Sequence, residues 1–109
     1  IYPVDLPSGL GLEAAGRILA VGEGVEEYRE GDRVATFGPL LGAYATRRNV
    51  GAAHLFRLPD TIDDRTAAAA ILKACTAEFL IERCARVEAG QDVLVHAAAG
   101  GVGLLLCQW

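Results

Sequence analysis

The sequence predicts an α/β protein in which a small β-barrel or sandwich is followed by the start of a doubly wound α/β domain. Three observations carry this prediction: glycine-rich, β-type runs before Pro59, a helical repeat after it, and a short apolar run leading into a glycine loop. Short strands separated by turn residues are typical of small barrels and sandwiches. A helix, a buried strand, a glycine loop and a second helix, in that order, are typical of a doubly wound domain.

Four runs in the first part of the chain are candidate strands. Residues 16–21 and 33–37 are rich in β-type side chains, and the second run is entered through the turn signal Gly31-Asp32. Residues 43–47 and 53–58 are further candidates.

The period of the sequence changes after Pro59 and indicates a helix. Asp63 is expected to be the N-cap, with Asp64 in the first turn complementing the helix dipole. Glu82 and Arg86 lie an i,i+4 step apart and are expected to pair, and Gly90 is expected to end the helix. The pattern does not decide whether the helix is interrupted near residues 74–75. The expected helical stripe consists of Leu72, Thr76, Leu80, Cys84 and Val87.

Residues 92–96 form a continuous apolar run, as in a strand covered on both faces. The loop at residues 97–103 follows, and the apolar start of a helix comes after it. A pyrophosphate site needs a tight turn, close approach of the backbone, and N–H groups aimed at the anion. Gly100 takes the close-approach position, Gly103 the position where helix and strand pack, and Ala98 stands where the usual first glycine would be. A structural turn is the alternative, but the strand before the loop and the helix after it favour a dinucleotide site.

The composition excludes several classes of function. With a net charge of −4 and no block of like charges, the sequence has no basic patch of the kind that binds nucleic acid. No apolar run is long enough for a membrane helix. No signal peptide is visible. The three cysteines are expected to be buried free thiols in a reducing cytoplasm. The abrupt ends of the chain lead us to expect a fragment of a longer protein.

With these residues described, the chain resembles the zinc-free quinone oxidoreductases (zeta-crystallin-like) of the medium-chain dehydrogenase/reductase superfamily. The resemblance covers nearly the whole chain. It implies a partial GroES-like β-barrel catalytic domain at residues 1–65 and the truncated start of a Rossmann dinucleotide-binding domain at residues 66–109. The matching segments are residues 6–16, Gly31-Asp32-Arg33-Val34, residues 72–76, Gly90-Gln91, Leu94, Ala98-Ala99-Gly100-Gly101, Gly103 and Gln108.

Zinc-dependent relatives carry Gly-His-Glu where this chain has Gly11-Leu12-Glu13. Leucine cannot ligate a metal, and the four-cysteine zinc lobe of those relatives has no counterpart here, so we expect no zinc. Glu13 is then expected to be a buried structural carboxylate bonded to backbone or to an arginine.

The resemblance also implies site residues. Tyr2 matches a tyrosine lining the nicotinamide and substrate pocket, which makes it the catalytic candidate, with an ordinary barrel tyrosine as its alternative. Thr76 matches a threonine near the nicotinamide end of the cofactor, with a helix hydroxyl bonded to local backbone as its alternative. His96, Lys73 and Tyr44 are interpreted as a packing or hydrogen-bonding histidine, a solvated lysine and a barrel tyrosine. The cofactor-binding candidates are Thr76, Ala99, Gly100, Gly101, Val102 and Gly103.

The resemblance implies NADPH-dependent, zinc-independent reduction of a quinone or similar electron-poor acceptor by a cytoplasmic homodimer. The residue that would choose NADP over NAD lies beyond Trp109. We expect the 109-residue chain to be inactive alone. Two alternatives stay open: reduction of an enone or enoyl thioester by the same kind of zinc-free enzyme, and NADPH binding without catalysis.

Overall fold

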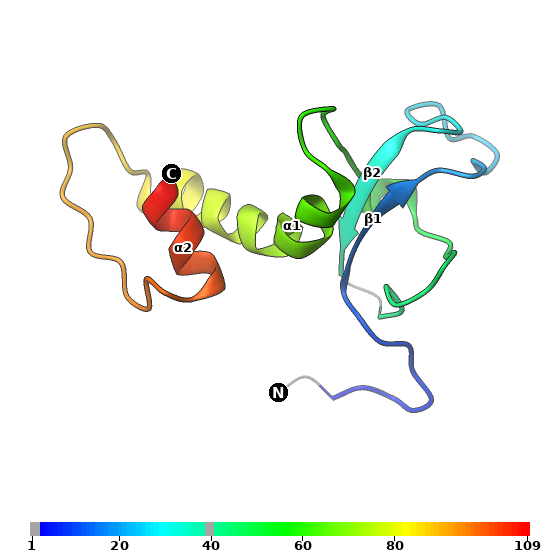
Figure 1. Ribbon diagram of the computed structural model, residues 1–109, viewed down its shortest axis with the longest axis horizontal. Helices are drawn as coiled ribbons and strands as arrows, with labels where there is room; N and C mark the ends of the chain where they lie inside the picture. Colours follow the sequence, from blue (N-terminus) through cyan, green and yellow to red (C-terminus); the bar gives the residue numbers. More distant parts are fainter. Residues whose placement is uncertain (1–2, 39–40) are drawn as a thin grey trace. The chain divides into compact units, whose positions relative to one another are not determined.

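Three short strands form one antiparallel sheet in the N-terminal part of the chain. The computed structural model describes residues 3–38 and 41–109, and the chain divides into two compact units, Ile1–Ile71 and Leu72–Trp109. The strands are β1 (Glu13–Arg17), β2 (Arg33–Phe37) and β3 (Phe56–Arg57), in the spatial order β1-β2-β3. The central strand, β2, pairs Ala35 with Ala15 of β1 and with Phe56 of β3. Figure 1 shows β1 and β2 side by side.

The strand predictions are confirmed only in part. Residues 33–37 form β2 as predicted, but the strand expected at 16–21 lies earlier, at Glu13–Arg17. The run at 53–58 contains the helical turn η1 (Ala52–His54) and only two strand residues. The sheet is therefore an open, three-stranded part of the expected barrel.

The strand predicted at residues 43–47 is wrong. Gly42 has a φ of +112°, and the backbone N–H groups of Gly42 and Ala43 both donate to the carbonyl of Gly11. The Tyr44 N–H donates to Leu10 in the same way, at 2.9 Å. These local bonds hold the segment against residues 10–11 in a non-strand conformation. Tyr44 itself is 81% exposed, so it is not a buried barrel residue.

The helix α1 (Asp64–Glu78) begins where the sequence predicts. The Asp63 carboxylate accepts hydrogen bonds from the backbone N–H of Thr66 at 3.0 Å and from its hydroxyl at 2.7 Å, so Asp63 is the N-cap. These bonds hold the pKa of Asp63 below its ordinary value, with the Thr66 hydroxyl as the largest cause.

Arg33 ties the end of β2 to the start of α1. Its Nε and Nη2 donate to Oδ1 of Asp64 at 3.0 and 2.6 Å, and Nη1 and Nη2 also donate to the carbonyls of Pro59 and Ile62. A forked guanidinium satisfies these acceptors together, as a lysine cannot. The Arg33 side chain is only 15% exposed. It therefore fixes the connection between the sheet and the helix within the first unit.

The helical segment continues beyond α1 in a wider form and ends earlier than predicted. A π-helical stretch, η2 (Phe79–Ala85), follows α1, and the chain leaves it at Arg86, whose φ is +50°. The prediction that Gly90 ends the helix is wrong, because Gly90 lies in a separate turn. The open question of a break at 74–75 is answered by unbroken α-helix there. The ion pair formed is Arg83 with Glu78, at 3.5 Å, instead of the predicted Glu82 with Arg86.

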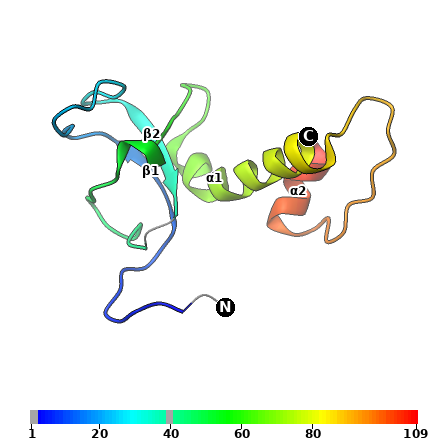
Figure 2. The same cartoon turned by 180° about the vertical axis from the view of Figure 1, so that it is seen from behind.

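Residues 92–96 do not form the predicted buried strand. Val93 is 55% exposed and Leu94 82% exposed, and the segment is part of a long loop visible from both sides (Figures 1 and 2). A parallel strand needs a neighbour for its N–H and C=O groups, and the described part of the second unit contains no other strand. The helix predicted after the loop is present as α2 (Gly101–Gln108).

The three cysteines are free thiols, as expected, but none of them is fully buried as the sequence predicted. Cys84 and Cys107 are exposed, and Cys75 is half-buried. Burial raises the pKa of the Cys75 thiol, and the charge of Glu78 adds to this effect. Among the described residues, no helix combines the length and apolar character needed to span a membrane.

Candidate dinucleotide-binding loop

The loop at residues 97–103 makes a tight turn directly before α2. Ala97 adopts a left-handed conformation with φ of +52°, and the Gly100 N–H donates to its carbonyl at 2.8 Å. A non-glycine residue with positive φ is uncommon and costs on the order of 1 kcal/mol. Ala98 was expected to take the place of the first glycine, but the left-handed turn falls at Ala97. Two small side chains therefore occupy the turn in place of glycine.

Gly103 is the loop residue with the least space for a side chain. A Cβ at this position would lie 2.3 Å from the carbonyl oxygen of Ala97 and 2.8 Å from the Cα of Ala98. Both are backbone atoms, so no side-chain rotation relieves the overlap. Gly103 is buried in the first turn of α2. It has the close-packing role between helix and preceding loop that the sequence predicted, although that loop is not a strand.

The N-terminus of α2 presents backbone N–H groups without a side-chain cap. Gly100 is the N-cap, with extended φ and ψ of −76° and 165°, and makes no side-chain hydrogen bond to the helix. The first N–H groups of a helix have no partner inside it and carry partial positive charge. Ala98, Ala99, Gly100 and Gly101 are all exposed. This arrangement suits an anionic group such as a pyrophosphate.

The Lys73 side chain lies close to the start of α2. A Cβ on Gly101 would be 2.9 Å from Cδ of Lys73 and 3.2 Å from its Cε, so the lysine side chain packs against the start of α2. Lys73 is half-buried, so at least the stem of this side chain is not fully solvated. Sequence reasoning missed this contact because Lys73 and Gly101 are far apart in the chain.

The other candidate residues are less closely tied to the loop. Thr76 is half-buried in α1, and its hydroxyl donates to the carbonyl of Leu72 at 2.8 Å. This local backbone bond was the alternative to a contact with the cofactor. His96 is exposed, so it is not a packing residue. Tyr2, the catalytic candidate, lies outside the described residues. Glu13 is half-buried at the start of β1.

No group of three or more metal-ligating side chains occurs among residues 3–38 and 41–109. Leu12, in the position of the zinc-binding histidine, is 41% exposed. Leu12 offers no ligand atom.

The open sheet lies in a part of the chain that matches a known protein family. The alcohol dehydrogenase GroES-like domain matches residues 1–60, which is more than half of the chain, and the chain belongs to this family. Over its whole length the chain is 46% identical to a quinone oxidoreductase of Pseudomonas aeruginosa, covering 34% of that protein.

Two further relatives bear on cofactor and acceptor. The structure of Escherichia coli quinone oxidoreductase complexed with NADPH superposes on 99% of this chain with a TM-score of 0.90 and 44% identity, covering 33% of the longer chain. A 2-haloacrylate reductase of a Burkholderia species is 40% identical to this chain. The matched region is 94% of this chain and 32% of the reductase. The chain thus spans about a third of the length of these relatives.

Proposed function

We propose that the protein to which these residues belong reduces quinones, or similar electron-poor acceptors, with NADPH and without zinc. The loop at residues 97–103 carries the proposal, because it joins a tight turn, a close-packed Gly103 and uncapped N–H groups at the start of α2. The identity to quinone oxidoreductases over the whole chain supports it.

In this proposal the loop holds the pyrophosphate of NADPH, and the N–H groups of Gly101, Val102 and Gly103 face it. Ala99 and Gly100 let the anion approach the backbone, because neither carries more than a methyl group. Bound NADPH supplies the hydride that reduces the acceptor. The protein orients the nicotinamide and excludes water from it.

Thr76 and Tyr2 are proposed to act at the nicotinamide end. The Thr76 hydroxyl donates its proton to Leu72, so toward the cofactor it can act only as an acceptor. Tyr2 is proposed to line the pocket for nicotinamide and acceptor. Its phenolic O–H is a group that can donate a hydrogen bond to an acceptor carbonyl.

The side chain at position 12 supports the proposed zinc independence. Without an imidazole there, no Lewis acid polarises the acceptor, and a quinone is electrophilic enough to accept hydride unaided. Metal analysis of the active, longer protein after dialysis against a chelator tests this. We expect less than one equivalent of zinc and unchanged activity, and loss of activity that added zinc restores contradicts it.

The domain organisation is part of the proposal. Residues 1–65 are proposed to belong to a GroES-like catalytic domain and residues 66–109 to the start of a Rossmann domain. A single loop and helix bury too little of a dinucleotide for turnover, so we propose that the 109-residue chain is inactive alone. A cytoplasmic homodimer is proposed for the longer protein, testable by sedimentation and by fractionation of cells.

The deciding experiment compares acceptors. The longer protein is assayed with NADPH and either 1,4-benzoquinone or an enoyl thioester, and NADPH binding is measured separately by fluorescence titration. We expect quinone turnover. Turnover of the enoyl substrate alone supports the second candidate, reduction of an activated C=C bond, which the similarity to a 2-haloacrylate reductase favours. Binding without turnover of either contradicts both and indicates a non-catalytic role.

A further inference from the structure

Lys73 is the single lysine of the 109-residue sequence, and its side chain lies against the first residue of α2. A Cβ added to Gly101 would be 3.8 Å from Cγ of Lys73, 2.9 Å from its Cδ and 3.2 Å from its Cε. Both residues belong to the second compact unit. The methylene stem therefore covers the start of the helix, and the ammonium group is attached one bond beyond Cε.

Glycine at position 101 leaves the space that this stem occupies. The backbone there does not require glycine, because Gly101 is absent from the positive-φ glycines of the chain. Alanine would be the better helix former at the start of α2. A Cβ would have to push the Lys73 stem aside, since Cδ lies inside normal contact distance of it. The small residue at position 101 thus keeps the lysine side chain close to the N-terminus of α2.

The charge of Lys73 lies at the end of the helix that repels cations. A helix N-terminus carries roughly half a positive elementary charge, so basic side chains are favourable at the opposite end. The first turn of α2 contains no acidic side chain, and its N-cap, Gly100, makes no side-chain hydrogen bond. The positive charge of the lysine and that of the helix dipole therefore act on the same place. An anion bound at the start of α2 is attracted by both.

Lys73 also shares a face of α1 with Thr76, the candidate for the nicotinamide end of the cofactor. Residues three apart in an α-helix are neighbours on its surface, about 4.5 Å apart along the axis. Of the two, Lys73 comes first in the chain, and its stem packs beside the glycine loop. In a dinucleotide the pyrophosphate is joined directly to the nicotinamide ribose. The two side chains are thus spaced as neighbouring groups of one cofactor molecule require.

We propose that Lys73 binds the pyrophosphate of NADPH, with its ammonium group donating to a phosphate oxygen of the anion that the N–H groups of α2 face. This inference rests on the proposed function, because it adds a residue to the same cofactor site. A lysine ammonium is a compact charge with three donors, which suits a phosphate oxygen. NADH contains the same pyrophosphate and lacks only the 2′-phosphate, so Lys73 acts equally on both nucleotides.

The test separates the charge of Lys73 from the packing of its stem. In the longer protein, Lys73→Met keeps an unbranched side chain and removes the charge, whereas Lys73→Arg keeps the charge. Dissociation constants for NADPH and NADH are measured by fluorescence titration, and urea denaturation without cofactor shows that each variant folds. We expect Lys73→Met to bind both nucleotides about 5- to 20-fold more weakly and Lys73→Arg to stay within about threefold of the unchanged protein.

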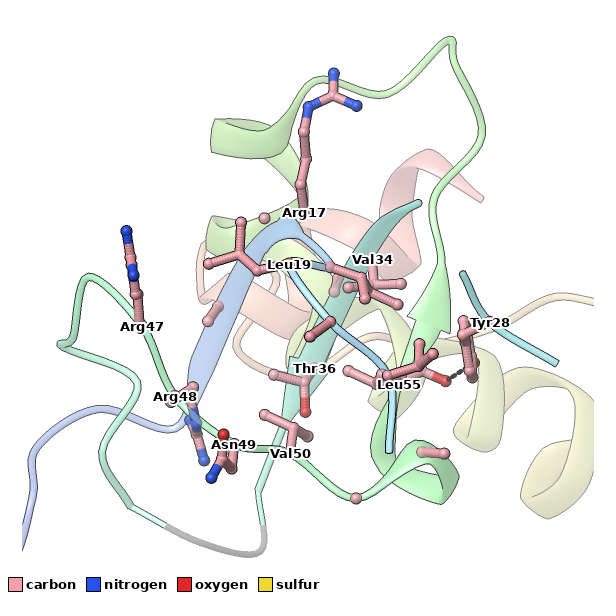
Figure 3. A pocket seen from close by; sticks show the side chains of 18 of the residues that line it. Arg17, Leu19, Tyr28, Val34, Thr36, Arg47, Arg48, Asn49, Val50 and Leu55 are labelled. Atoms are coloured by element: carbon pink, nitrogen blue, oxygen red, sulfur yellow. Dashed lines mark hydrogen bonds between the residues drawn. The ribbon is translucent and has the colours of Figure 1, made fainter. Parts of the chain in front are cut away.

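Ionic strength provides a measurement that packing alone does not change. Added salt screens a partly exposed ion pair, so the difference in affinity between the unchanged protein and Lys73→Met should shrink between about 20 mM and 500 mM salt. Arg47→Met is the charge-matched control. Arg47 is exposed and extends from the groove on the sheet of the first unit (Figure 3). Its substitution should leave both affinities and their salt dependence unchanged.

A second measurement uses the unchanged protein and needs no variant. The longer protein is acetylated with an N-hydroxysuccinimide ester, with and without saturating NADPH, and the peptide that contains residue 73 is followed by mass spectrometry. We expect NADPH to slow acetylation of Lys73 by roughly fivefold or more, because the bound phosphate engages the amine.

An unchanged affinity of Lys73→Met overturns the inference, and so does unchanged acetylation in the presence of NADPH. An equal, salt-independent loss in Lys73→Met and Lys73→Arg overturns it too, because only packing is then affected. A loss confined to NADPH assigns the lysine to the 2′-phosphate and also contradicts the inference. In all these cases the unchanged protein still binds NADPH, so the proposed function stands. If the unchanged protein binds neither nucleotide, both proposals fail.

Discussion

Gly103→Ala is the substitution that tests the geometry of the loop most directly. The new methyl group would stand 2.3 Å from the Ala97 oxygen, 2.8 Å from the Ala98 Cα and 3.0 Å from the Ala97 carbonyl carbon. All three are backbone atoms of the turn, so the turn must move away from α2. Replacing a helical glycine by alanine normally gains about 1 kcal/mol, whereas forcing extra atoms into a packed site costs about 1–3 kcal/mol.

The overlap is expected to outweigh the gain in helix propensity, because a contact of 2.3 Å is far inside normal packing. A net cost of about 1–2 kcal/mol in loop geometry corresponds to NADPH binding roughly 5- to 30-fold weaker. The assay is a fluorescence titration of the longer protein with NADPH, together with a urea denaturation curve for each variant.

Gly101→Ala is the matched control in the same helix. Its Cβ would meet Cδ and Cε of Lys73, the far end of a flexible side chain that can swing aside. We therefore expect it to retain binding far better than Gly103→Ala does. If Gly103→Ala binds NADPH as tightly as the unchanged protein, or if Gly101→Ala is the more damaging change, the packing argument is refuted.

Three further predictions concern the first unit and the cysteines. Arg33→Ala is expected to destabilise the first unit by about 1–3 kcal/mol in urea denaturation. The effect should exceed that of Asp64→Ala, because Arg33→Ala also removes the donor to the carbonyls of Pro59 and Ile62. Equal effects of the two substitutions would contradict this. Asp63 has a lowered pKa, so its stabilising effect is full above the ordinary value of 3.8 and is lost as the pH falls through the folded pKa. The stability difference between the unchanged chain and Asp63→Ala should therefore shrink between pH 5 and pH 2, and a constant difference would contradict it. Iodoacetamide should modify Cys84 and Cys107 before Cys75, whose thiol is half-buried with a raised pKa; peptide mass spectrometry reads the order, and faster reaction of Cys75 would contradict it.

Local features of the fold could be read from the sequence. Asp63 caps α1 because its carboxylate reaches an N–H three residues on, and this geometry depends only on neighbouring residues. The start of α2 after Gly100, and the need for glycine at position 103, follow equally from short-range sterics. The family resemblance also came from sequence, because the glycine loop and the residues before β1 stand at matching positions.

Other features depended on distant partners and were therefore mispredicted. Residues 92–96 have the composition of a buried strand, but a strand exists only when another strand accepts its hydrogen bonds. Residues 43–47 were diverted by bonds to residues 10–11, and Lys73 reached Gly101 only through the fold of the second unit. In this protein the sequence determined the helix starts and the tight turn of the glycine loop, whose hydrogen bonds close within a few residues. The tertiary structure alone decided which strands form and which distant side chain, that of Lys73, packs against the start of α2, because those outcomes depend on groups far away in the chain.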